Sequence, residues 1–211
     1  MIHRVLILGA TGGLGQQVLA QALEAGHDVT ILARDKSKVT LQHPSLRVIA
    51  GTLPEDAAAL AEAMRGQGVV ISTLGRGNSF KSTGLIERCV PVILSTMQAC
   101  RVRRLVFTSA IGVGGSFSEA PLLQKIFITL LLRDIYADKA AGDALIRESD
   151  LDWTIVRPAR LTDGPLTGKY RDGERLSLSG MPSISRADVA HFILSQLDDV
   201  THVRRIVTVA S

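Results

Sequence analysis

Short runs of apolar and often β-branched residues recur along the chain, separated by stretches in which the apolar positions have helical spacing. The runs that predict strands are residues 4–9, 28–33, 46–51, 69–73, 104–110, 153–158 and 204–210. Most are continuously apolar rather than alternating, which is typical of a parallel sheet covered by helices on both faces. The helical spacing predicts helices at 13–25, 54–65, 83–102, 122–148 and 185–197.

This alternation of strand and helix favours an α/β fold with a Rossmann-type, doubly wound parallel sheet. A length of 211 residues suits one domain, so residues 1–211 are interpreted as a single unit. Two helix starts carry their own signals, because Pro54 precedes two acidic residues and the segment SRAD at 185–188 offers a cap with an acid three residues on. The segment 161–182, rich in Gly, Pro, Thr and Ser, is expected to be a loop with at most a short hairpin.

A glycine-rich turn, GATGGLG, lies between the first predicted strand and the first predicted helix. It places Gly9, Gly12 and Gly15 where a dinucleotide site needs a tight turn, a close approach of the backbone to a pyrophosphate, and close packing of helix on strand. The helix N-terminus then offers free N–H groups to the anion. Because strand, turn, helix and second strand follow in the expected order, the pattern favours a dinucleotide site over a merely structural turn.

The second predicted strand ends at Arg34, and this residue bears on the choice of coenzyme. An Asp or Glu at that position binds the ribose 2′-hydroxyl of NAD, whereas an arginine accommodates the 2′-phosphate of NADP. Lys36 and Lys38 add positive charge nearby, so NADP(H) is predicted in preference to NAD(H). Two alternatives remain: a solvated surface role for Arg34, and an approach of Asp35 to the ribose if the strand runs one residue longer.

Several motifs together resemble a known family. GATGGLG is followed by ILARD (31–35), FTSAIG (107–112) and IRESDLDWTIVRPARLTDGPLTGKY (146–170). Over essentially the whole chain, this pattern resembles the atypical short-chain dehydrogenase/reductase group in its NmrA-like branch, and it is similar there to flavin reductase/biliverdin-IXβ reductase proteins. The VRP strand end and the PLTG segment are its most specific pieces.

The resemblance implies that NADP binds along the carboxyl ends of the strands, with substrate-pocket loops around 111–123 and 160–182. Thr52 departs from the pattern, since the family often has Asp there, near the adenine. The implied contacts run from the phosphates and the 2′-phosphate, past the adenine and ribose side, to the nicotinamide: Gly9, Thr11, Gly12, Gly13, Leu14, Gly15, Arg34, Thr52, Leu53, Thr73, Leu74, Gly75, Arg76, Thr108, Ser109, Lys139, Pro158, Ala159, Arg160 and Leu161.

The candidate catalytic residues are Ser109, Tyr136 and Lys139. In the wider superfamily a Tyr and a Lys four positions apart act together, the Lys lowering the pKa of the proton-donating Tyr. Here Tyr136 and Lys139 are three apart, which keeps them on one helix face but changes their angle. Either they form a catalytic pair, or Lys139 contacts the ribose alone, or it faces solvent. Ser109, at a strand end, either binds the carboxamide or a substrate carbonyl, or satisfies a local backbone group.

The nature of the hydride acceptor is inferred from the residue that replaces a proton donor of the related reductases. Arg160 stands where the flavin/biliverdin reductases have a histidine, so a fixed positive charge replaces a group that titrates near neutrality. Hydride transfer to an oxidised flavin needs little beyond holding donor and acceptor together, which favours a planar flavin-like or quinone-like acceptor. The alternative is a non-catalytic NADP-binding redox sensor of the NmrA type. A sugar-nucleotide epimerase is disfavoured because the chain is short for the usual substrate domain.

Composition narrows the remaining partners and the setting. The net charge of +4 is scattered and offers no nucleic-acid footprint, and the basic spot RVRR (101–104) is expected where a helix ends before a strand. No run is long enough for a transmembrane helix, and the five histidines show no metal spacing, so neither a membrane nor a metal is predicted. Cys89 and Cys100 would lie roughly 16 Å apart in one helix, too far for a disulfide. A cytoplasmic monomer or homodimer without a signal peptide is expected.

Overall fold

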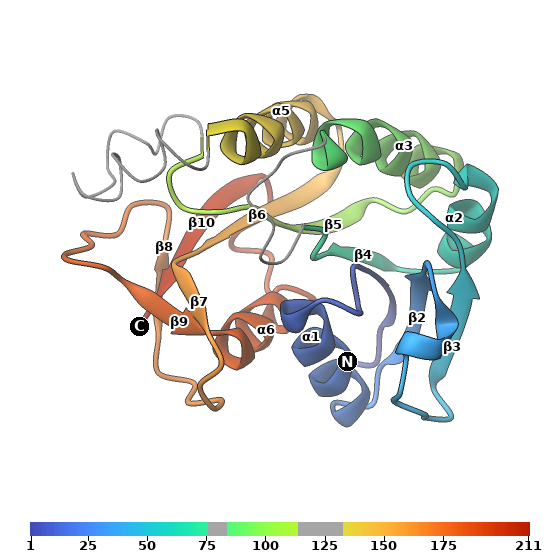
Figure 1. Ribbon diagram of the computed structural model, residues 1–211, viewed down its shortest axis with the longest axis horizontal. Coiled ribbons are helices and arrows are strands. Elements are labelled where there is room, and N and C mark those ends of the chain that lie inside the picture. Colours follow the sequence, from blue (N-terminus) through green and yellow to red (C-terminus); the bar gives the residue numbers. More distant parts are fainter. Residues whose placement is uncertain (76–83, 114–132) are drawn as a thin grey trace.

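The computed structural model describes residues 1–75, 84–113 and 133–211, and a twisted sheet runs through its centre (Figure 1). Within these ranges eight strands form one sheet in the order β3-β2-β1-β4-β5-β6-β10-β8. Neighbouring strands are parallel except for the last pair, in which β8 runs antiparallel to β10. The strands span Arg4–Leu8 (β1), Asp28–Ala33 (β2), Leu46–Ala50 (β3), Val69–Ser72 (β4), Arg104–Thr108 (β5), Asp152–Pro158 (β6), Arg171–Gly173 (β8) and Arg205–Ala210 (β10).

Helices cover both faces of this sheet. Figure 1 shows α2, α3 and α5 on one face and α1 and α6 on the other. They span Gly13–Glu24 (α1), Ala57–Met64 (α2), Leu85–Ala99 (α3), Arg133–Glu148 (α5) and Arg186–Ser195 (α6), and a short 3-10 helix, η1, spans Lys36–Lys38. This is the Rossmann-type, doubly wound α/β arrangement that the sequence predicts.

The inner strands are apolar on both faces because both faces are packed. Val5 and Ile7 of β1 lie in the cluster beneath α1 and α6, whereas Leu6 and Leu8 lie in the cluster beneath α2, α3 and α5. All four side chains are at most 1% exposed. The continuous apolar runs therefore report two buried sheet faces, as expected for parallel strands.

The predicted strands are confirmed, with bounds that differ by a residue or two at their ends. The helices differ more. The predicted helix 54–65 is observed only at Ala57–Met64, because Asp56 accepts the N–H of Thr52 and donates its own N–H to the Thr52 carbonyl, which closes a turn before the helix begins. The predicted helix 122–148 is observed from Arg133, and its first part lies outside the described residues.

The segment 161–182 contains more regular structure than the predicted loop with at most a short hairpin. Its two ends carry β7 (Arg160–Thr162) and β9 (Ser183–Ser185), which pair in parallel, and between them β8 joins the edge of the main sheet beside β10. Both pairings are long-range, and β7, β8 and β9 are each only three residues long. Such strands have too few apolar positions to show a periodic pattern.

The cysteines behave as their spacing predicts. Cys89 lies buried within α3 and Cys100 follows its last turn, and both are free thiols. Burial raises the pKa of the Cys89 thiol to about 11, which keeps it protonated and unreactive.

Candidate functional site

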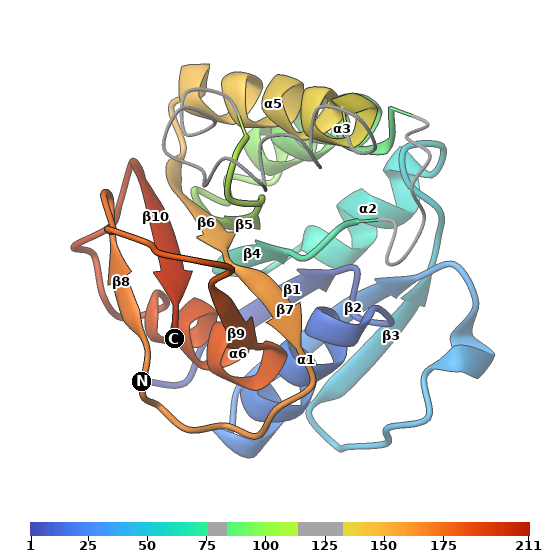
Figure 2. The same cartoon turned by 60° about the vertical axis from the view of Figure 1, so that its left-hand side comes forward.

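The candidate site lies at the edge of the sheet where the parallel strands end. The strand order reverses between β1 and β4, which pair in register from Val5↔Val69 to Leu8↔Ser72. Ligands of open α/β sheets bind outside the carboxyl ends of the strands at such a reversal. Figure 2 shows α1 beginning beside this edge, close to the strand ends. The topology therefore brings the glycine turn and the ends of β2, β4, β5 and β6 to one edge.

The glycine turn is built so tightly that only glycine fits at two of its positions. Gly9 has φ +84, and an added Cβ would lie 2.9 Å from the carbonyl carbon of Thr73. An added Cβ on Gly15 would lie 2.1 Å from the carbonyl oxygen of Gly9, where helix packs on strand. At Gly12 the nearest atom is at 3.4 Å, an ordinary contact, so this glycine leaves open space that a ligand can approach.

The start of α1 offers uncompensated N–H groups to that space. Gly12 is the N-cap residue and gives no side-chain cap, and no acidic residue lies in the first turn. Thr11, Gly12 and Gly13 are exposed, whereas Leu14 and Gly15 pack inward. A helix start without a capping side chain or a carboxylate favours an anion, so this turn fits a pyrophosphate.

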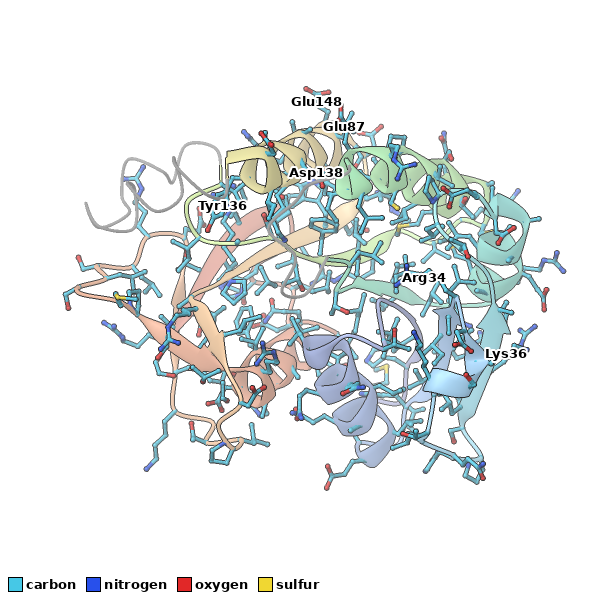
Figure 3. The ribbon with its side chains drawn as sticks, viewed as in Figure 1. Arg34, Lys36, Glu87, Tyr136, Asp138 and Glu148 are labelled. Atoms are coloured by element: carbon cyan, nitrogen blue, oxygen red, sulfur yellow. The ribbon has the colours of Figure 1, made fainter. Side chains whose placement is uncertain are left out.

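At the end of β2, Arg34 and Asp35 have different surroundings. Arg34 is exposed and follows the last residue of the strand. The Asp35 carboxylate accepts hydrogen bonds from the N–H and the hydroxyl of Ser37, at 3.0 and 2.6 Å, and so caps η1. These bonds hold the pKa of Asp35 below its usual value. Figure 3 shows Arg34 nearer the centre of the molecule and Lys36 at its outer edge. Of these two cations, Arg34 is therefore the better placed to contact a ligand at the strand ends.

The residues after β3 and β4 line the same edge. The Thr73 hydroxyl donates to the Leu8 carbonyl at 3.1 Å, which ties the end of β4 to β1. Leu74 is half-buried and Gly75 is exposed, whereas Arg76 lies outside the described residues. After β3, Thr52 and Leu53 are half-buried beside the start of α2. Their roles as coenzyme contacts stay predictions.

The end of β5 holds a buried polar network that sequence reasoning missed. The Ser109 hydroxyl donates to Asp143 Oδ2 at 3.0 Å, and Arg157 Nη2 donates to the same oxygen at 2.9 Å. Ser109, Asp143 and Arg157 are 3%, 3% and 7% exposed. Burial raises the pKa of the Asp143 carboxyl, and the hydrogen bonds from Arg157 and Ser109 oppose the rise. One signal was available in the sequence: Arg157 is a charged residue inside an apolar strand, which requires a buried partner.

Tyr136 and Lys139 lie on the same helix as Asp143, with spacings of three and four that place all three on one face of α5. Figure 3 shows Tyr136 beneath the first turn of α5. Burial raises the pKa of the Tyr136 phenol. Burial also lowers the pKa of the Lys139 ammonium, an effect that the Asp143 and Asp138 carboxylates oppose. A lysine that activates a tyrosine would lower the phenol pKa, so these shifts do not support a catalytic pair.

The neighbouring polar groups complete the edge. The Thr108 hydroxyl is buried and has no hydrogen-bond partner among the described residues. Beyond β6, Ala159 donates its N–H to the Val209 carbonyl, Arg160 is exposed, and Leu161 is half-buried. The pocket loop predicted at 111–123 lies outside the described residues beyond residue 113. Within the described ranges no group of three His, Cys, Asp or Glu side chains is arranged to hold a metal ion, and no helix is long and apolar enough to cross a membrane.

Comparisons with known proteins place this geometry in a wider group. The chain is 26% identical to the protein YwnB of Bacillus subtilis, over 99% of this chain and 98% of that one. A short-chain dehydrogenase/reductase of Veillonella parvula, solved with NADP, has the same fold with a TM-score of 0.85 at 22% identity, covering 100% of this chain and 95% of that one. ChuY of Escherichia coli O157:H7, described as an anaerobilin reductase, has a TM-score of 0.79 at 23% identity, with 98% and 96% covered.

The two solved structures show that this chain has the fold that the motifs predict. A family profile with the description NAD(P)H-binding matches residues 9–200, a range that begins at the first glycine of the turn and includes the ends of β2, β4, β5 and β6. The chain therefore belongs to the NAD(P)H-binding protein family.

Proposed function

We propose that this protein is an NADPH-dependent oxidoreductase that transfers hydride to a planar acceptor of flavin-like or quinone-like structure. The observation that carries the proposal is the pairing of an uncapped, acid-free helix start at Gly12 with an exposed arginine at the end of the next strand. The first fits a pyrophosphate and the second fits a 2′-phosphate. At the same strand end, Asp35 accepts two hydrogen bonds from Ser37 at its Oδ1, whereas the Arg34 guanidinium is the group whose charge suits a phosphate.

The chain's own residues would hold the coenzyme in three places. The N–H groups at the start of α1 would bind the pyrophosphate, Arg34 the 2′-phosphate, and the strand ends at Thr108 and Pro158 would flank the nicotinamide. When bound, the reduced nicotinamide supplies a hydride, and reduction of an oxidised flavin then takes one further proton from solvent. The proportions are one NADPH, one proton and one flavin on one side, with NADP⁺ and dihydroflavin on the other.

The polar groups near the end of β5 favour an acceptor that needs no dedicated protein acid. The Ser109 proton is committed to Asp143, and the raised pKa of Tyr136 makes its phenolate unfavourable, so neither is a ready proton donor. An acceptor whose reduced form takes its proton from water avoids this restriction. ChuY, a structural neighbour, is described as an anaerobilin reductase, which supports a reductase of this fold.

The surroundings of Ser109 and Tyr136 also favour a second function. If neither Ser109 nor Tyr136 donates a proton, the protein is equally suited to bind NADP(H) without turnover and to act as a redox sensor. Oxidation of NADPH and of NADH in the presence of FMN, a benzoquinone and a simple aldehyde separates the two. We expect turnover with FMN or the quinone, faster with NADPH. Tight NADP⁺ binding with no turnover on any acceptor would favour the sensor, and turnover on the aldehyde alone would contradict the planar-acceptor proposal.

A further inference from the structure

A cavity lies on the face of the sheet that carries α5, over β6 and β10. Along β6 the side chains of Trp153, Ile155 and Arg157 alternate onto this face, and Ile206 and Thr208 of β10 lie beside them. The opposite face of β10, through Val207 and Val209, packs in the cluster beneath α6. The cavity has a volume of about 310 Å³, which reaches the lower end of the range for small-molecule sites.

The lining of this cavity is almost entirely made of hydrogen-bond donors. Around Trp153 stand five arginines with one carboxylate, that of Glu174: Arg147, Arg157, Arg175, Arg204 and Arg205. Guanidinium and indole groups donate hydrogen bonds and accept none. Glu174 already pairs with Arg205 at 3.4 Å. A cavity with this composition suits a ligand rich in anionic oxygens.

The floor carries two donors that lack partners. The indole Nε1 of Trp153 and the Nε of Arg157 are both buried, and neither has a hydrogen-bond partner among the described residues. Trp153 is 6% exposed and Arg157 is 7% exposed. An unpaired buried donor costs free energy, and native structures resolve the cost with a bound water, ion or ligand. Both residues line the cavity, and because the two nitrogen atoms are themselves covered, a ligand would pair with them only after a small shift of these side chains.

The rim of the cavity carries four exposed arginine side chains. Arg147, Arg175, Arg204 and Arg205 are exposed, and the Arg204 guanidinium also donates to the Asp150 carbonyl at 3.0 Å. Exposed arginines of like charge repel one another, and an oxyanion among them removes that repulsion while gaining bidentate hydrogen bonds. The two unpaired buried donors at the floor distinguish this site from a scattered basic surface.

We propose that this cavity is a binding site for a small, multiply charged oxyanion, of the polyphosphate or polycarboxylate class. It is separate from the coenzyme edge, since its residues come from β6, from β10 and the residue before it, from the segment after β8 and from the end of α5, not from the glycine turn or β2. Arg157 belongs to both settings: it lines the cavity and pairs with Asp143, which accepts the Ser109 hydrogen bond. Occupancy of the cavity therefore acts on the end of β5 through one guanidinium.

The test uses Trp153, the one tryptophan of the chain, as its own reporter. In the presence of excess NADP⁺, which occupies the glycine turn, the protein is titrated with inorganic phosphate, pyrophosphate and citrate, with sodium chloride at matched ionic strength as the control, and indole emission is recorded. We expect a saturable change with pyrophosphate or citrate, reproduced by calorimetry, and not with chloride. Stronger binding of pyrophosphate assigns the site to phosphates, and stronger binding of citrate assigns it to carboxylates.

Two matched double variants separate this site from general charge. Arg175→Gln/Arg205→Gln removes two rim arginines, one of them ion-paired, and should weaken binding at least about tenfold. Arg47→Gln/Arg65→Gln makes the same charge change far from the cavity, again with one member ion-paired, and should leave binding within about twofold. Absence of saturable binding, or equal effects of the two variants, would overturn the proposal.

Discussion

The hydroxyl of Ser109 donates a hydrogen bond to the carboxylate of Asp143, 34 positions away, and the two groups are buried together at the end of β5. The candidate proton donor of the strand end is therefore held by an acceptor from α5, which in turn holds Arg157. This relationship makes a positioning or structural role for Ser109 testable apart from a chemical one.

Ser109→Ala should cost stability more than activity. Removal of a hydroxyl that satisfies a buried carboxylate lowers the free energy of unfolding by about 1–3 kcal/mol. With no proton to supply, kcat for NADPH oxidation with the preferred acceptor should fall less than about threefold. Urea unfolding and steady-state kinetics measure the two effects. A fall in kcat above about a hundredfold, with NADPH affinity unchanged, would instead make Ser109 a chemical participant.

Removal of one member of the Asp143–Arg157 ion pair should destabilise the protein more than removal of both members. Asp143→Ala leaves the Arg157 guanidinium buried without its counter-charge, and the free energy of unfolding should fall by about 3–5 kcal/mol. The double variant Asp143→Leu/Arg157→Met removes both charges and should regain most of that loss. Thermal and urea unfolding of the single and double variants checks this. Additive losses in the double variant would mean that the two side chains act independently.

The glycine turn separates folding from coenzyme binding. A Cβ at Gly15 would lie 2.1 Å from the Gly9 carbonyl oxygen, so Gly15→Ala should disrupt the packing of α1 on β1 and lower the melting temperature strongly. Gly12→Ala meets nothing closer than 3.4 Å and should fold normally. Its methyl group would fill the space offered to the pyrophosphate, so NADP⁺ affinity should fall at least about tenfold by calorimetry. Full affinity in Gly12→Ala would place the pyrophosphate elsewhere.

Arg34 should decide the coenzyme preference. Arg34→Glu replaces a charge-assisted contact with a repulsion and should weaken NADP⁺ binding by a few kcal/mol, with little effect on NAD⁺. Lys36→Glu makes the same charge change two residues on, at the outer edge of the molecule, and is the matched control (Figure 3). We expect the control to change NADP⁺ affinity by less than about threefold. Equal losses in both variants would reduce the role of Arg34 to general electrostatic attraction.

Acidic pH should remove the stabilisation that the Asp188 carboxylate gives to the folded state. Burial of Asp188 favours its neutral form, but hydrogen bonds from Thr167, Gly168 and Ser185 outweigh burial and hold its pKa below the usual 3.8. A lowered folded-state pKa means that this contribution is present above the unfolded pKa and is lost as pH falls through the folded one. The stability difference between the wild type and Asp188→Asn should therefore be constant near neutrality and shrink at strongly acidic pH. Unfolding measured from pH 7 to 2 tests this, and a difference that does not change with pH would contradict it.

The sequence by itself determined the alternation of buried strands and amphipathic helices, the glycine turn and the arginine after the second strand. These features are local: a strand buried on both faces must be continuously apolar, and a turn with a Cβ-free packing contact must be glycine. Ser185 was readable for the same reason, since a cap and the acid that completes it lie within one turn, as its hydrogen bond from the Asp188 N–H confirms.

Only the tertiary structure decided what each polar group at the edge is free to do. Ser109 was a free hydroxyl in the sequence until α5 brought Asp143 to it, 34 positions away. The pairing of β7 with β9 and the donor-lined cavity over β10 arise in the same way, from segments distant in sequence. Hydrogen-bond partners that are distant in the sequence follow from packing geometry. The sequence pattern does not say which distant group will bond to a given donor or acceptor.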